Sequence, residues 1–214
     1  MSFVITVAQR KGGAGKTTLA CHLASAFRAA GLSVRAIDAD PQKSFSLWGA
    51  ARRRALPDEN AFSLEQASGF ALSGALRASS SDIVIIDTPP SVDMSVERAI
   101  RASDLVLTPL QLSPIDLAAS LPTAQAIGEA GRPFLFVINR APPRARIADD
   151  IRAQIKKHRI PCASTELGNR AAYAEAIAQG LGVVESEPAS LAGQEVSALA
   201  REVLKRRSAR EKAA

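Results

Sequence analysis

The amino-acid sequence predicts a single-domain, doubly wound α/β fold in which a mostly parallel sheet is flanked by helices. Its 214 residues, 47% of them hydrophobic, suffice to bury one sizeable core. Short runs that are apolar on both faces recur along the chain, which is typical of buried parallel strands. Segments between them carry apolar residues three or four positions apart, for example Leu19, Leu23 and Phe27, as helices packed on a sheet do. Alternation of the two patterns indicates right-handed strand-helix-strand crossovers.

Five strands are expected from the apolar runs, at residues 3–8, 34–37, 83–86, 105–107 and 134–138. We expect one domain over residues 1–204. The remaining segment, residues 205–214, is basic, carries six charges and has no bulky apolar residue. Such a tail has little to bury, so we expect it to fray.

The composition favours an anionic partner without choosing one. Twenty-seven Lys and Arg against twenty-one Asp and Glu give a formal charge of +6, which suits nucleic acid, nucleotide or anionic lipid. Cys21 and Cys162 are far apart and in no paired-ligand spacing, so neither a disulfide scaffold nor a metal cluster is indicated. No apolar stretch approaches the roughly 20 residues of a membrane span. We therefore expect a cytoplasmic protein.

A glycine-rich loop at residues 10–18, RKGGAGKTT, follows the first expected strand and opens the first expected helix. This is the context of a phosphate-binding P-loop. Glycines let backbone N–H groups and the positive end of the helix converge on an anion. Lys16 adds a charge toward the β- and γ-phosphates, and the Thr17 hydroxyl can ligate magnesium. The predicted nucleotide-binding residues here are Gly12, Gly13, Ala14, Gly15, Lys16, Thr17 and Thr18.

Aspartates lie at the carboxyl ends of two further expected strands. Asp38 and Asp40 lie in the IDADPQ segment at residues 37–42, and Asp87 ends the DIVIID segment at residues 82–87. Because ligands sit beyond the carboxyl ends of strands in an open α/β sheet, Asp38 and Asp40 should face the γ-phosphate and its magnesium. Asp87 is the expected metal-site residue, acting through a magnesium-bound water. The alternatives are turn-forming aspartates before proline, and an ordinary strand that ends in Asp.

A second lysine, Lys11, directly precedes the glycines, so that the loop reads KGGxGKT. Together with the DxDPQ segment and the carboxylate at residue 87, this loop resembles the deviant Walker A motif of the ParA/MinD family of P-loop ATPases. The resemblance covers most of residues 3–204. It implies that ATP and Mg²⁺ are the cofactors, that Lys11 crosses a dimer interface to the partner's phosphates, and that Asp40 positions the attacking water. It also implies that Asp38 supports the metal shell. The alternative for Lys11 is an exposed, solvated lysine.

Two further segments resemble the family less closely. Asn139 ends the expected strand at 134–138, where the family's asparagine hydrogen-bonds the adenine edge; a plain turn residue is the alternative. Residues 110–116 resemble part of the family's dimer face. Within them Ser113, which precedes Pro114, is alternatively a simple helix cap.

The short chain resembles the small ParA partition ATPases within the family. The resemblance implies a homodimer with ATP, nonspecific DNA binding, nucleoid association, and a cargo-bound or centromere-binding partner that stimulates hydrolysis. The cargo would be a plasmid, a chromosomal locus or a protein assembly such as a chemoreceptor cluster or carboxysome. Nonspecific binding requires Lys and Arg contacts to phosphates, and the candidates are Arg170, Arg201 and Lys205. Each is alternatively a solvated surface charge.

The main rival is a MinD-like, membrane-associated spatial regulator. Such proteins end in an amphipathic helix with bulky apolar residues, whereas nothing larger than alanine on the apolar scale follows Leu204. We therefore expect no membrane partner. A reductase related to the nitrogenase iron protein would need cluster-ligating cysteines at a dimer interface, for which Cys21 and Cys162 are poorly placed.

Overall fold

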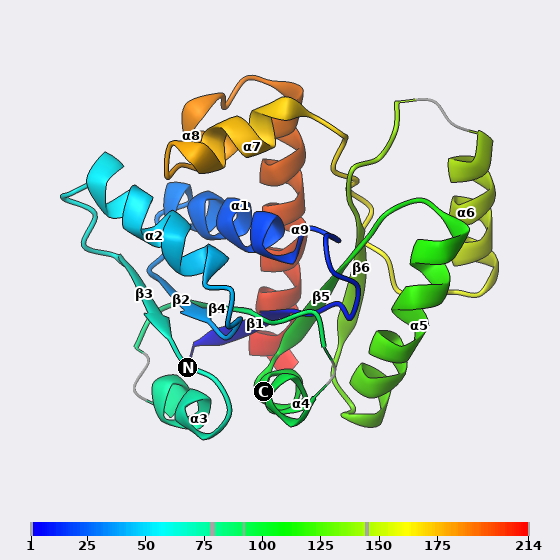
Figure 1. Ribbon diagram of the computed structural model, residues 1–214, viewed down its shortest axis with the longest axis horizontal. Helices are drawn as coiled ribbons and strands as arrows, with labels where there is room; N and C mark the ends of the chain where they lie inside the picture. The colour runs from blue at the N-terminus through cyan, green and yellow to red at the C-terminus, as the bar shows by residue number, and fades with distance from the viewer. Residues whose placement is uncertain (1, 78–79, 92, 144–145, 214) are drawn as a thin grey trace.

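The computed structural model describes residues 2–77, 80–91, 93–143 and 146–213. They form one sheet that lies between two layers of helices (Figure 1). The strand order is β3-β2-β4-β1-β5-β6, and every neighbouring pair is parallel. The strands are β1 (Phe3–Val7), β2 (Val34–Asp38), β3 (Phe62–Gln66), β4 (Ile83–Asp87), β5 (Leu105–Leu110) and β6 (Phe134–Ile138). The predicted fold class is confirmed, and the five expected runs are β1, β2, β4, β5 and β6.

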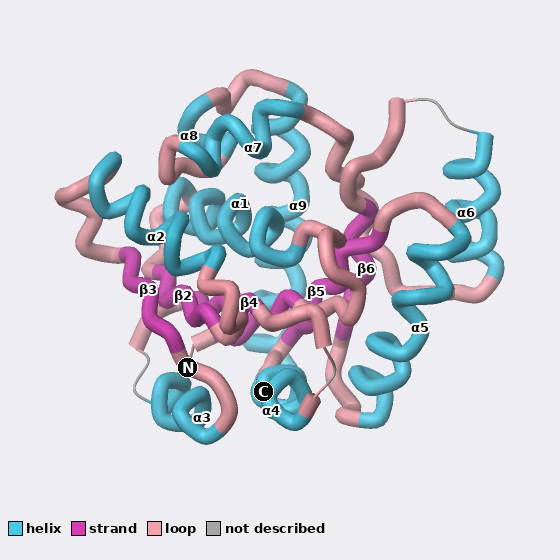
Figure 2. Tube along the Cα trace, in the orientation of Figure 1, coloured by secondary structure: helices cyan, strands magenta, loops and turns pink. Residues whose placement is uncertain are grey.

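Helices cover both faces of the sheet, as Figure 2 shows. On one face lie α1 (Lys16–Ala29), α2 (Ser44–Ala55), α7 (Ala171–Ala178), α8 (Val183–Ser186) and α9 (Leu191–Ala213). On the other lie α3 (Phe70–Arg77), α4 (Met94–Ala102), α5 (Pro114–Glu129) and α6 (Arg146–Lys157). The stripe of Leu19, Leu23 and Phe27 is buried in the core of the first face, as its spacing predicted.

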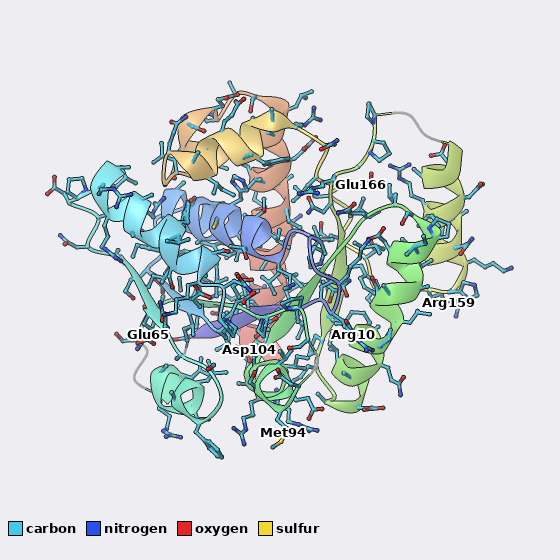
Figure 3. The ribbon with its side chains drawn as sticks, viewed as in Figure 1. Arg10, Glu65, Met94, Asp104, Arg159 and Glu166 are labelled. Atoms are coloured by element: carbon cyan, nitrogen blue, oxygen red, sulfur yellow. The ribbon has the colours of Figure 1, made fainter. Side chains whose placement is uncertain are left out.

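Strand β3 is the one that the apolar runs did not reveal. It forms an edge of the sheet and pairs only with β2, and its residues are half-buried or exposed. Its Glu65, labelled in Figure 3, accepts hydrogen bonds from Arg35 of β2 at 2.7 and 3.0 Å. An edge strand with one neighbour needs no continuous apolar run, because one long side of it faces solvent.

The C-terminal segment differs from the expectation of a frayed tail. Helix α9 continues without a break to Ala213, and Ala214 lies outside the described residues. Arg207 lies 3.8 Å from Asp82 and Arg210 lies 2.5 Å from Asp104, two carboxylates that directly precede β4 and β5. The charges that suggested fraying therefore attach the helix to the amino edge of the sheet. Among the described residues, no helix has both the length and the apolar character needed to cross a membrane.

Candidate nucleotide site

The loop between β1 and α1 has the backbone geometry of an anion site. Gly13 and Gly15 have φ angles of 74° and 95°, in the left-handed region that favours glycine. A Cβ added at Gly15 would lie 2.3 Å from Nδ2 of Asn139, so both conformation and space require glycine there. Helix α1 starts at Lys16 and has no acidic residue in its first turn. The partial positive charge of its N-terminus is therefore left for an anion.

Lys16 is buried at the start of α1, with 7% of its surface exposed. Burial lowers the pKa of its ammonium group, while the nearby charges of Asp87 and Asp40 act in the opposite direction. The charged form of a lysine buried in this way is stabilised when polyanionic phosphates bind beside it. Its predicted role toward the β- and γ-phosphates stays a prediction.

Thr17 and Asp87 meet at the carboxyl edge of the sheet. The Thr17 hydroxyl donates to Oδ2 of Asp87 at 2.6 Å, and the other carboxylate oxygen, Oδ1, is buried without a hydrogen-bond partner in the described part of the chain. Burial raises the pKa of Asp87 to about 7, although the bond from Thr17 opposes this. A hydroxyl beside a buried carboxylate oxygen without a partner fits the oxygen-ligand preference of magnesium. Thr17 and Asp87 would hold the ion, which would neutralise charge on the phosphates.

Asp38 has a different environment from Asp87, although the two are paired in register between β2 and β4. Its Oδ2 accepts from the amide and hydroxyl of Ser46, each at 2.7 Å, and its Oδ1 accepts from the amide of Asp40 at 3.1 Å. These contacts attach the end of β2 to the first turn of α2. In the structure Asp38 thus holds the loop that carries Asp40, while its support of a metal shell stays a prediction.

Asp40 is half-buried, and its Oδ1 accepts from the amide of Gln42 at 2.9 Å. That bond is an Asx turn, so the turn-forming alternative describes the local backbone correctly. Its charge also acts on Lys16, which places the carboxylate within electrostatic range of the phosphate-binding lysine. Both observations leave the predicted role in orienting water open.

Lys11 forms an ion pair within its own chain. Its Nζ lies 2.5 Å from Oδ1 of Asp116 in the first turn of α5, and the lysine side chain is 36% exposed. The Ser113 hydroxyl accepts from the amide of Asp116 at 3.0 Å and also contacts the carboxylate, so the alternative interpretation of Ser113 as a helix cap is correct. Pro114 occupies the first turn, as expected. The part of Lys11 in a partner's site is not tested by these contacts.

Gln9 is a site residue that sequence reasoning missed. It is 2% exposed, donates to the Pro109 carbonyl at 3.2 Å and to the Ser120 hydroxyl at 2.8 Å, and accepts from Thr123 at 3.2 Å. It therefore attaches the start of the loop to β5 and α5, just before Arg10, which is labelled in Figure 3. The only signal in the sequence is a polar residue at the end of an apolar run.

A cavity of about 440 Å³ continues from the first turn of α1, lined by residues 18, 139–140, 168–171 and 173–174. Asn139 is 5% exposed and lies between the loop and this cavity: its Nδ2 donates to the Ala14 carbonyl at 2.9 Å, and its Oδ1 accepts from the Arg140 amide at 2.9 Å. Asn139 thus supports the P-loop, a role that neither the adenine nor the turn interpretation contained. The predicted contact with adenine is untested.

The three DNA-contact candidates do not lie together. Arg201 and Lys205 are exposed one turn apart on α9 and line a shallow groove with Leu204 and Ser208. Arg170 instead lines the cavity beside Asn139 and pairs with Glu195 of α9 at 2.5 Å. The structure therefore separates Arg170 from the basic surface of α9, and DNA contact by any of them stays a prediction.

Comparisons with known proteins agree with this geometry. Residues 5–183 match the model of the CobQ/CobB/MinD/ParA nucleotide binding domain. The chain is 32% identical over 187 residues to Maintenance of carboxysome distribution protein A of Gloeobacter kilaueensis, covering 85% of this chain and 84% of that one. It is 27% identical over 237 residues to the Chromosome-partitioning ATPase Soj of Thermus thermophilus, covering 94% and 95% of the two chains.

A solved structure supports the fold. The septum site-determining protein MinD of Pyrococcus horikoshii, complexed with Mg-ADP, superposes with a TM-score of 0.75 at 19% identity, covering 95% of this chain and 96% of that one. A family match over residues 5–183 includes the P-loop, Asp38, Asp87 and Asn139. The chain therefore belongs to the CobQ/CobB/MinD/ParA family of nucleotide-binding domains, among the ParA/MinD-type proteins.

Proposed function

We propose that this protein is a ParA-type, magnesium-dependent ATPase that dimerises on ATP, binds DNA nonspecifically as a dimer, and so positions or segregates a cargo. A partner protein bound to the cargo stimulates hydrolysis and releases the dimer. The observation that carries the proposal is Lys11, a half-exposed lysine beside the P-loop that pairs with Asp116 of its own chain.

The chemistry requires charge neutralisation at the transferred phosphoryl group. Loop amides and Lys16 would bind the triphosphate from within one chain, and Thr17 and Asp87 would hold a magnesium ion that neutralises part of its charge. Asp40, at the same edge of the sheet, orients the attacking water. Lys11 of a second copy supplies the remaining positive charge, in the manner of an arginine finger. Hydrolysis therefore depends on the dimer.

The face around Lys11 suits a second copy. Ile115, which precedes Asp116 on α5, is an apolar residue that is 76% exposed. Gln111, in the segment expected at the dimer face, is half-buried and donates to the Gly13 carbonyl at 3.3 Å. An interface here would therefore contact the P-loop directly and respond to the nucleotide in it.

DNA binding would use the exposed basic surface of α9. Arg201 and Lys205, with Arg206 and Lys212, are all exposed on this helix. A dimer presents two copies of the cluster, so that contacts which are weak singly act together. The relatives named for carboxysome distribution and chromosome partitioning support a positioning role, with a protein assembly or a DNA molecule as the cargo.

The test uses an Asp40→Ala variant, which we expect to trap the ATP dimer. Light scattering with Mg-ATP should show the mass doubling in this variant, and the additional change Lys11→Ala should abolish the doubling while nucleotide binding persists, since Lys16 and the loop amides remain. Arg10→Ala, one residue earlier and exposed, is the matched control and should still dimerise. A strictly monomeric Asp40→Ala protein would refute the proposal.

The DNA arm of the test uses the trapped dimer. Random-sequence duplexes should bind with ATP and not with ADP, and each phosphate contact should contribute roughly 0.9 to the slope of log affinity against log salt. Reversing Arg201 and Lys205 together should flatten that slope. Binding to anionic vesicles and not to DNA would favour a membrane-associated regulator instead.

A further inference from the structure

Arg170 is fixed at the wall of the cavity beside the P-loop. It directly precedes α7, and its guanidinium group donates from Nη2 to Oε1 of Glu195 at 2.5 Å and from Nε to both carboxylate oxygens at 3.1 Å. Glu195 is fixed in turn, since it accepts from the Tyr173 hydroxyl at 2.6 Å and from the Gly168 amide at 2.9 Å. One carboxylate of α9 therefore determines where the guanidinium lies.

The guanidinium plane lies over Gly168. A Cβ added at Gly168 would be 3.0 Å from each of Cζ, Nε and Nη2 of Arg170. Equal distances to three atoms of a planar group place that point above the plane. Glycine thus leaves room for the guanidinium to lie flat against the backbone, with one face covered. Because Arg170 also lines the cavity, its remaining surface is available to a bound molecule.

The cavity adjoins the P-loop, so that a nucleotide with its phosphates in the loop could extend its base into it. Thr18, two residues after Lys16, lines it, and Asn139 connects it to the loop through the Ala14 carbonyl. Its volume of about 440 Å³ falls within the usual range for small-molecule sites, about 300–1,000 Å³.

We propose that Arg170 is the residue on which the nucleobase stacks, and that Glu195 is the positioning residue that holds its guanidinium plane ready. This inference rests on the proposed nucleotide function. Guanidinium groups stack on aromatic faces, whereas an ammonium group of equal charge offers no plane. Glu195 reduces the conformational entropy that the arginine loses on binding, and its charge keeps the arginine from attracting the phosphates away from the P-loop.

The matched control is Arg152. It makes the same kind of two-point pair, donating from Nε and Nη2 to Glu166 at 2.7 Å, and its side chain is 34% exposed against 35% for Arg170. It does not line the cavity. Loss of Arg152 therefore removes a comparable ion pair without touching the base site.

The experiment measures the affinity of each variant for Mg-ATP and for inorganic tripolyphosphate, which has the phosphates and no base. Arg170→Ala should weaken ATP binding about tenfold and leave tripolyphosphate unchanged, as expected for loss of one stacked base. Arg170→Lys should lose as much as Arg170→Ala, since charge without a plane does not stack. Glu195→Gln should lose less, and Arg152→Ala should bind both probes normally.

Other results would overturn the proposal in distinguishable ways. Equal loss of ATP and tripolyphosphate in Arg170→Ala would show a general effect on the fold. Full affinity in Arg170→Lys would show that charge alone matters. Normal ATP affinity with lost DNA binding would make Arg170 a DNA contact. If the unmodified protein binds neither probe, the proposed nucleotide function itself fails, and this inference fails with it.

Discussion

The phosphate end and the base end of the site are constructed in opposite ways. The phosphate end is mostly backbone: two left-handed glycines and a helix N-terminus within residues 12–16, with Thr17 and Asp87 beside them. The base end consists of side chains from four separate segments, Thr18, Asn139, residues 168–174 and, behind them, Glu195. Where the backbone binds the ligand, the sequence requirement is local. Where a network of side chains binds the ligand, the residues that the site requires are distributed over the chain.

Asp87→Asn should give the largest effect, because it disrupts the phosphate end and leaves the base end intact. Loss of the carboxylate charge removes the main attraction for magnesium, and we expect hydrolysis to fall by at least about a hundredfold. Steady-state phosphate release measures this. The control is Asp82→Asn. Asp82 directly precedes the first residue of β4, at the end of the strand opposite Asp87, and this variant should hydrolyse ATP normally.

The same variant should be more stable than the parent in the absence of nucleotide and magnesium. The pKa of Asp87 is raised from its ordinary value of 3.8 to about 7 by burial, so ionisation of this group destabilises the fold as pH rises through that window. At pH 8 the asparagine variant avoids this cost. Thermal unfolding at pH 8 should show a higher midpoint, and a lower midpoint would show that the buried charge is compensated.

This contrast explains how much could be predicted from the sequence. Local patterns alone predicted that Lys16, Thr17 and Asp87 lie together, because a P-loop and a strand-terminal carboxylate are compact patterns. The pairing of Lys11 with Asp116, and of Arg170 with Glu195, joins residues 105 and 25 positions apart, and no local pattern reports it. Edge strand β3 was not predicted from the sequence for a related reason, since its half-buried and exposed residues form no apolar run.

The helical form of the C-terminal segment was missed for the same physical reason. Composition correctly showed a charged segment without bulky apolar residues, but its Arg207 and Arg210 pair with Asp82 and Asp104, which are distant in sequence. Charged residues at a helix end are therefore not evidence of fraying when acidic residues of the sheet edge lie within reach.

Asp116→Asn should produce a smaller effect and tests how Lys11 is held. Asp116 competes with a partner's phosphates for the Lys11 ammonium group, so its loss should let the Asp40→Ala protein dimerise with ATP at a lower concentration. A partly exposed ion pair contributes up to about 1 kcal/mol, which is roughly a fivefold shift. Light scattering across a dilution series measures it.

The control for this prediction is Asp104→Asn. Asp104 is as buried as Asp116, 8% against 9%, and lies 2.5 Å from Arg210 at the other end of the sheet. Its loss should not change the dimerisation concentration. Weaker dimerisation in Asp116→Asn would mean that Asp116 aligns Lys11 for the partner and does not compete for it.

His22 concerns the connection between α1 and the base end, and its effect is expected on stability. Its Nε2 lies 3.2 Å from the carbonyl of Tyr173, whose hydroxyl binds Glu195, and its Nδ1 accepts from the Val183 amide at 3.1 Å. These bonds require a neutral ring. The pKa of His22 is lowered to about 4, mainly by burial of the ring.

The sign of the pH effect follows from that shift. The folded-state pKa lies below the ordinary value of 6.5, so the unfolded chain binds the proton first, and stability is complete above pH 6.5 and is lost as pH falls toward 4. At pH 5 the loss attributable to His22 is about 2 kcal/mol.

His22→Gln keeps a donor and an acceptor but does not titrate, so urea unfolding should show a smaller loss of stability between pH 7 and pH 5 than in the parent. His158→Gln, at the exposed histidine, should behave as the parent does. An unchanged pH dependence in His22→Gln would mean that the ring accepts a proton without breaking its contacts. The base end would then not depend on a neutral histidine.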